Sequence, residues 1–149
     1  MFEIKYNFAN SNNINVANED ETALRYNFFL GSLIFKKDNN IISMDWDWIP
    51  LLDFAICLLI ICNNLLKKNQ TEEDFDFTES DSKIVFQKNG DNIKIVTSFS
   101  DEILEMSFEE FQKTVRGFYK DVIFEVIERN QEIKGNNAFI KYLKEAERM

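Results

Sequence analysis

A chain of 149 residues, with 45% apolar and 29% charged residues, has the composition of a soluble globular protein rather than a disordered one. It is long enough to bury a hydrophobic core without disulfides or metals, so we expect one domain, residues 1–149. The net charge is −9, from 17 basic and 26 acidic side chains. Because such a surface repels phosphates, it argues against direct binding to nucleic acids or anionic lipid, and it favours a basic partner.

The N-terminal part of the chain has the pattern of β-strands. Apolar and polar residues alternate, with Phe2, Ile4, Tyr6 and Phe8 on one face. We interpret the polar residues 10–21 as a loop. The aromatic and β-branched residues of 25–37 predict a second extended segment, with a bulge or kink at Gly31. Residues 37–40, "KDNN", predict a turn after it.

The next segment, residues 41–48, alternates again. Its apolar face carries Ile42, Met44, Trp46 and Trp48. Asp45 and Asp47 fall on the other face, and we interpret them as the solvent side of a strand whose aromatic side joins the core. A functional alternative stays open, because two carboxylates can share a divalent cation or act as an acid/base pair. We also treat them as secondary candidates for partner binding.

The run "DWDWIPLLDFAICLLIICNNLLKK", residues 45–68, raises the question of a membrane span. With Asp53 at the bilayer centre, the free energy of membrane insertion would be less favourable by about 2.5 to 3.5 kcal/mol. Pro50 and two asparagines interrupt the run further. Pro50 suits the start of a helix and Asp53 its positive end. Because the segment is apolar on every side, it predicts a buried central helix at about 50–67. We therefore do not expect the segment to span a membrane.

Two further expectations depend on this helix. Asp53 is expected to accept backbone N–H bonds at the helix end, with proton chemistry at a raised pKa as the alternative. Cys57 and Cys62 both lie in the helix and are expected to be reduced, buried and inert. The N-terminus has no basic and apolar signal segment, so we expect a cytoplasmic protein.

An acidic segment, "NQTEEDFDFTESDS" at 69–82, follows the helix and contains six acidic and no basic side chains. A calcium loop does not fit, because Glu79 stands where the loop needs glycine and Val85 where it needs a bidentate glutamate. The plain interpretation is a solvated loop. Phe75 and Phe77 alternate with the carboxylates, however, and protein interfaces use aromatic anchors in such surroundings.

The C-terminal half contains the clearest local signals. Two alternating segments, "KIVFQK" and "NIKIVTSF", meet at Asn89-Gly90 and predict a β-hairpin. Ser107 and Glu110 form a capping-box pattern that opens a helix with an apolar stripe, and Gly135 is expected to end it. A last helix is expected from about Asn137. Together these elements predict an α+β fold in which a mostly antiparallel sheet packs against helices.

Catalytic and cofactor motifs are not found in the sequence. The chain has no histidine, and its four glycines form neither a P-loop nor a dinucleotide fingerprint. Cys57 and Cys62 have no further Cys or His to complete a metal site. We therefore expect a protein that is not an enzyme and that uses no cofactor and no metal.

The order of elements, with "MDWDWIPLLDFA" followed by "FDFTESDSKIVF", resembles small acidic cytoplasmic immunity proteins of bacterial polymorphic and contact-dependent growth inhibition toxin systems. The resemblance covers most of the chain as an architecture. It implies a protein that binds the catalytic domain of a toxin, often a basic nuclease, and blocks it without doing chemistry itself.

The sequence thus predicts a binding protein for a basic protein partner, with the acidic segment as the first candidate for the contact. The candidate residues are Glu72, Glu73, Asp74, Phe75, Asp76, Phe77, Glu79 and Asp81. Two alternatives stay open. One is a regulatory or adaptor domain that binds a basic protein or peptide, and the other is an enzyme that works through carboxylates and a bound metal.

Overall fold

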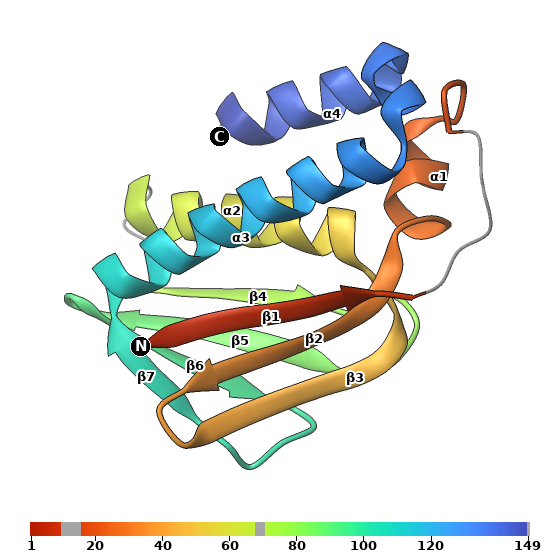
Figure 1. The fold of residues 1–149 in the computed structure, drawn as a ribbon. Helices are drawn as coiled ribbons and strands as arrows, with labels where there is room; N and C mark the ends of the chain where they lie inside the picture. The colour runs from red at the N-terminus through yellow and green to blue at the C-terminus, as the bar shows by residue number, and fades with distance from the viewer. Residues whose placement is uncertain (10–15, 68–70, 149) are drawn as a thin grey trace.

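Two antiparallel sheets lie on one side of the fold and helices cover them (Figure 1). The computed structural model describes residues 1–9, 16–67 and 71–148. The buried side chains of these residues form one hydrophobic core between the sheets and the helices. The expected α+β class is therefore confirmed, although the expected sheet is divided into two.

The first sheet has the strand order β1-β2-β3. Its strands are β1 (Phe2–Phe8), β2 (Leu30–Lys37) and β3 (Asn40–Pro50). The register shifts between Gly31 and Leu33, which pair with Ile49 and Met44, so β3 carries extra residues at 45–48. Gly31 is required at this bulge, because a Cβ there would lie 2.1 Å from the carbonyl oxygen of Asn7. The expected irregularity at Gly31 is confirmed.

The second sheet has the strand order β4-β5-β6-β7. Its strands are β4 (Glu72–Asp76), β5 (Lys83–Asn89), β6 (Asn92–Thr97) and β7 (Leu104–Ser107). The predicted hairpin is confirmed, since Asn89 pairs with Asn92 across a tight turn in which Gly90 has a φ of +62°. The acidic residues 72–76 are not a loop. They form the edge strand of this sheet.

A short helix, α1 (Glu21–Tyr26), corrects the expectation of an extended segment that starts at Arg25. Asp20 caps it by accepting the N–H of Ala23 at 2.9 Å, and Leu24 is fully buried. The strand β2 begins only at Leu30. A helix of six residues is too short to show a helical period, so its sequence looked like part of the loop and of the strand that flank it. Of the expected loop, residues 10–15 lie outside the described part of the chain.

The helix α2 (Leu51–Lys67) is the expected buried central helix. It contacts three helices, α1, α3 and α4, and three strands, β2, β3 and β4, which explains why apolar residues surround it. Pro50 is the last residue of β3 and precedes the first helical turn. Among the helices of the described residues, none combines the length and the apolarity that crossing a membrane requires.

Three helical segments complete the chain: α3 (Phe108–Arg129), the 3-10 helix η1 (Gln131–Gly135) and α4 (Asn137–Arg148). Ser107 caps α3 through the N–H of Glu110 at 3.1 Å. The carboxylate of Glu110 does not complete the capping box but accepts the N–H of Phe2 and pairs with Lys37 at 2.9 Å. Gly135 ends η1, so the expectation that it ends the long helix is wrong by six residues.

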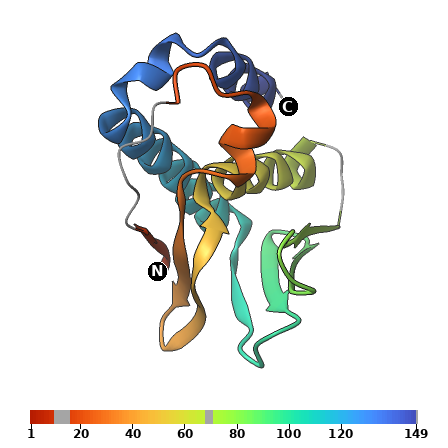
Figure 2. The same ribbon diagram turned by 90° about the vertical axis from the view of Figure 1, so that its right-hand side faces the viewer.

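The two sheets lie side by side beneath the helices (Figure 2). Aromatic side chains fill the space between them near the bulge of β3. Trp46 stacks on Trp48 with ring centroids 5.2 Å apart, and it meets Phe77 and Phe99 edge to face. The tryptophans are half-buried, so the expected aromatic face of 41–48 does join the core.

Candidate protein-interaction surface

The strand β4 presents its two faces to different surroundings. Glu72, Asp74 and Asp76 are exposed, whereas Glu73 and Phe75 are half-buried and face α2. Because side chains alternate along a strand, the three exposed carboxylates form one row on the outer face of the sheet. We call Glu72, Asp74 and Asp76 the acidic row.

The backbone of the acidic row also points outward. Phe77 donates its N–H to Ser82 and Thr71 accepts from Lys88, so the odd-numbered residues of this segment bond to β5. The N–H and C=O groups of Glu72, Asp74 and Asp76 therefore point away from β5, and β4 is an edge of its sheet. Carboxylates and outward backbone groups thus occur at the same three positions.

Neighbouring side chains balance the acidic row only in part. Asp74 forms an exposed ion pair with Lys83 at 3.5 Å, and Glu72 accepts a hydrogen bond from Gln87 at 3.2 Å. Exposed pairs of this kind contribute only about 0 to 1 kcal/mol, so the carboxylates are not committed to them. Glu79 and Asp81, in the turn between β4 and β5, are exposed as well.

Two candidate residues of the segment have structural partners. Glu73 accepts a hydrogen bond from the side-chain amide of Asn64 at 2.6 Å, which ties β4 to α2. Phe77 is only 4% exposed and packs against Trp46, Trp48 and Phe54. Its ring belongs to the core, which corrects the expectation that it anchors a partner at the surface.

Phe75 has an intermediate position. Its ring lies 4.8 Å from that of Phe54 and 5.0 Å from that of Phe77, and the side chain is half-buried. Phe75 therefore packs on the α2 side of β4, on the face opposite the acidic row. The sequence placed both phenylalanines in the same class because alternation shows that two residues share a face, but not which face is covered.

Asp45 and Asp47 are exposed in the bulge of β3. Asp47 has a φ of +61°, and Ser32 holds it there: its hydroxyl donates to the Asp47 carboxylate at 2.9 Å and accepts the Asp47 N–H at 3.0 Å. Asp47 thus stabilises the bulge that positions the two tryptophans. Among the described residues, no group of three or more Cys, Asp or Glu side chains is arranged to hold a metal ion.

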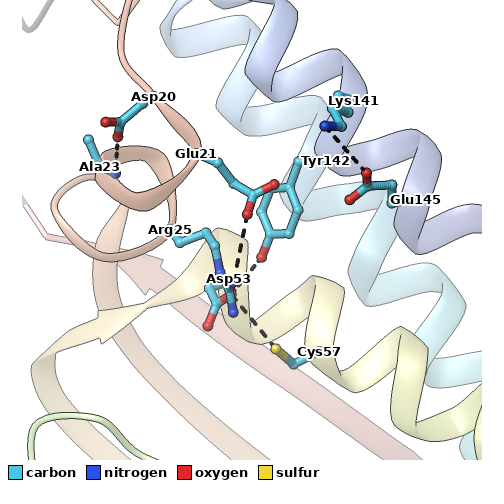
Figure 3. A network of polar contacts seen from close by, with 9 residues as sticks. All are labelled: Asp20, Glu21, Ala23, Arg25, Asp53, Cys57, Lys141, Tyr142 and Glu145. Carbon is cyan, nitrogen blue, oxygen red and sulfur yellow. Dashed lines mark hydrogen bonds and ion pairs between the residues drawn. The ribbon is translucent and has the colours of Figure 1, made fainter.

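Asp53 is the one carboxylate that the structure buries, at 4% exposure, among the described side chains. It accepts hydrogen bonds from the Arg25 guanidinium at 2.8 Å, the Tyr142 hydroxyl at 2.5 Å and the Cys57 thiol at 3.7 Å (Figure 3). The expectation of a carboxylate that only caps the helix end is therefore replaced by a buried ion pair joining α1, α2 and α4. The sequence reasoning missed both partners, although a charge in an apolar helix signals that some partner is needed.

This network shifts the ionisation of its members. Burial raises the pKa of Tyr142, and the Asp53 charge raises it further. Burial lowers the pKa of Arg25, but the charge and the hydrogen bond of Asp53, with smaller effects of two tyrosines, together raise the pKa overall. Both groups therefore keep their protons, which suits a fixed structural contact rather than proton transfer.

The two cysteines differ in exposure. Cys62 is buried, as expected, whereas Cys57 is half-buried, beside a small pocket of about 170 Å³ between α1, α2 and α4. Burial, followed by the Asp53 charge, raises the pKa of Cys57 to about 12, and burial raises that of Cys62 to about 11. Both thiols are therefore protonated and weakly nucleophilic near neutral pH.

No protein-family profile, curated protein or solved structure matches this chain. The geometry and charge of the described residues are therefore the basis for assigning a role to this surface. Of the expected contact residues, β4 and the turn after it bring Glu72, Asp74, Asp76, Glu79 and Asp81 to the surface, while Glu73 and Phe75 are half-buried and Phe77 is buried.

Proposed function

We propose that this protein is a non-catalytic binding protein for a basic protein domain, and that it acts as an immunity protein that neutralises a nuclease-type toxin. The observation that carries the proposal is the acidic row on an edge strand, at which carboxylates and outward backbone groups coincide. An immunity protein needs only to cover the basic substrate-binding surface of its toxin.

Electrostatics supports a basic partner. With a net charge of −9, the protein steers cationic surfaces toward itself, and the acidic row concentrates charge where a partner can approach. Steering acts over about 8 to 10 Å at physiological salt, so the row chiefly raises the association rate.

The test is co-expression and binding with the product of the neighbouring reading frame. Glu72→Gln, Asp74→Asn and Asp76→Asn together should slow association and flatten its salt dependence, because they remove three charges that act by steering. The matched control changes the same number of exposed charges elsewhere, as Asp101→Asn, Glu102→Gln and Glu132→Gln. Equal effects of the two triple variants would show that only net charge matters, and a harmless or acidic neighbour would contradict the immunity role.

A second candidate function is an adaptor domain that binds an extended basic peptide. The outward N–H and C=O groups of Glu72, Asp74 and Asp76 favour it, because an edge strand can accept a further strand. The two functions differ in the smallest part of the partner that this protein should bind. An adaptor should hold a short peptide from its partner, whereas an immunity protein should require the folded toxin domain.

A further inference from the structure

The first sheet, which does not carry the acidic row, has β1 as an edge strand, and a groove borders this strand. The strand β1 runs along α3 (Figure 1), and between them lies a groove of about 510 Å³. Its lining residues are Tyr6, Asp121, Phe124, Glu125, Glu128 and Arg129. We call this space the β1–α3 groove.

Tyr6 is the β1 residue that lines this groove, and the outward backbone groups of β1 lie at Tyr6 and at alternate residues before and after it. Ala9 donates its N–H to Leu30, so the odd-numbered residues of β1 bond to β2 and the even-numbered ones point outward. At Phe2, α3 satisfies these outward groups, since Glu110 accepts the N–H and Thr114 donates to the C=O. Among the described residues, no such partner serves Ile4, Tyr6 and Phe8, and the first sheet ends at their edge.

The side chains of the groove combine an apolar surface with negative charge. Phe124, near the C-terminal end of α3, is 65% exposed, which is the largest exposure among the phenylalanines of the described residues. Three carboxylates line the groove against one guanidinium, and Arg129 is already paired with Glu125 at 2.9 Å. Asp121 and Glu128 are exposed and therefore open to a cation.

We propose that the β1–α3 groove binds an extended basic segment of a partner protein, which adds to the edge of β1 as a further strand. The backbone of Ile4, Tyr6 and Phe8 supplies the hydrogen bonds, and α3 forms the second wall of the groove. This proposal does not depend on the acidic row, which lies on the edge of the other sheet.

Charge and shape select arginine or lysine at the positions that face the groove. Their aliphatic stems pack on Phe124, and their charged ends reach Asp121 and Glu128, which an apolar or acidic side chain would leave unpaired. The opposite face of the added strand continues the outer face of β1, where Glu3, Lys5 and Asn7 are exposed, and polar residues fit there.

The probe is an eight-residue peptide in which threonine and arginine alternate, blocked at both ends and labelled with a fluorophore. We expect it to bind at moderate salt, as measured by fluorescence anisotropy, and a peptide with glutamate in place of arginine not to bind. Phe124→Ala should weaken binding of the arginine peptide by about tenfold or more. Because Phe124 is exposed, the melting temperature should not change.

Two matched variants separate this groove from a general attraction of opposite charges. Asp121→Asn with Glu128→Gln should weaken binding, whereas Asp101→Asn with Glu102→Gln, which removes the same charge elsewhere, should not. The triple variant of the acidic row should bind the peptide unchanged, so a failure here is distinguishable from a failure of the proposed function. If the groove variant, the control variant and the acidic-row variant all lost affinity for the peptide equally, the groove would not be the binding site.

N-methylation tests strand addition directly. In an added strand the amides that face β1 all belong to residues whose side chains share one face, so they are either all arginine or all threonine amides. Methylating one series should abolish binding and methylating the other should not. Retention of binding in both series, or its loss in both, would overturn the added strand.

Discussion

Asp53 and the acidic row use the same chemical group in opposite ways. Asp53 lies in the core, where Arg25, Tyr142 and Cys57 donate to it, and it joins three helices. The carboxylates of the acidic row have one weak ion pair and one hydrogen bond to the neighbouring strand β5, both at the surface. Removing a carboxylate destabilises the fold when the carboxylate is buried and its fixed partners are left unpaired. A carboxylate with exposed, exchangeable partners is instead available for recognition.

The largest effect should follow from removing the buried carboxylate. Asp53→Ala should lower the free energy of unfolding by about 3 kcal/mol, because it leaves the Arg25 charge and the Tyr142 hydroxyl without their shared acceptor. Chemical denaturation measures this change. A loss below about 0.5 kcal/mol, the size of a surface substitution, would mean that the ion pair is worth no more than an exposed one.

The thiol beside Asp53 should give a smaller effect that depends on pH. The pKa of Cys57 is raised in the fold, so the folded state holds the thiol proton more tightly than the unfolded state does. This contribution to stability is complete below the ordinary pKa of a thiol and is lost as the pH rises toward 12. Between pH 8 and pH 10 the loss should be about 1 kcal/mol.

The control for this prediction is Cys57→Ser, which removes the ionisable thiol and keeps a similar shape. Its free energy of unfolding should fall less over the same pH range, measured by urea denaturation at each pH. The same thiol should resist alkylation in the folded protein at pH 8 and react after unfolding. Rapid alkylation of native Cys57 would contradict the protonated, shielded thiol that the structure places beside Asp53.

The smallest effect on stability should come from the acidic row. Asp74→Asn should change the free energy of unfolding by less than about 0.5 kcal/mol, since its ion pair with Lys83 is exposed. Comparing its loss of stability with that of Asp53→Ala shows how much the burial of a carboxylate changes its contribution to stability. A loss comparable to that of Asp53→Ala would show that the acidic row is structural and not available to a partner.

Local patterns predicted much of the fold. The alternation in β1, the Asn89-Gly90 turn and the apolar run of α2 are each visible within a short stretch of sequence, and each is confirmed. The same reasoning failed at α1, whose six residues are too few to show a period. It also took the strand β4 for a loop, because its charges outweighed an alternation that is only five residues long.

The candidate site could be predicted only in outline. The sequence located a concentration of carboxylates at 72–81, but it did not separate Phe77, which is buried, from the exposed residues around it. It did not point to the β1–α3 groove, because Tyr6 and Phe124 are distant in sequence and each resembles an ordinary core residue. Which of two alternating faces is covered depends on the elements that pack against the strand, and no local pattern specifies them.

The charge of the protein, the periods of its main strands and helices, and the positions at which glycine or an N-cap residue fixes the backbone could all be recognised from the amino-acid sequence. Those features depend on single residues or on short repeats, so they are readable without the fold. Tertiary packing was needed to bring Arg25 and Tyr142, which lie 28 and 89 residues away in the chain, to Asp53, and to place β1 and β4 at the edges of their sheets. The physical reason is that burial and pairing arise when distant segments meet, and a residue's environment is set by that meeting rather than by its neighbours in the chain.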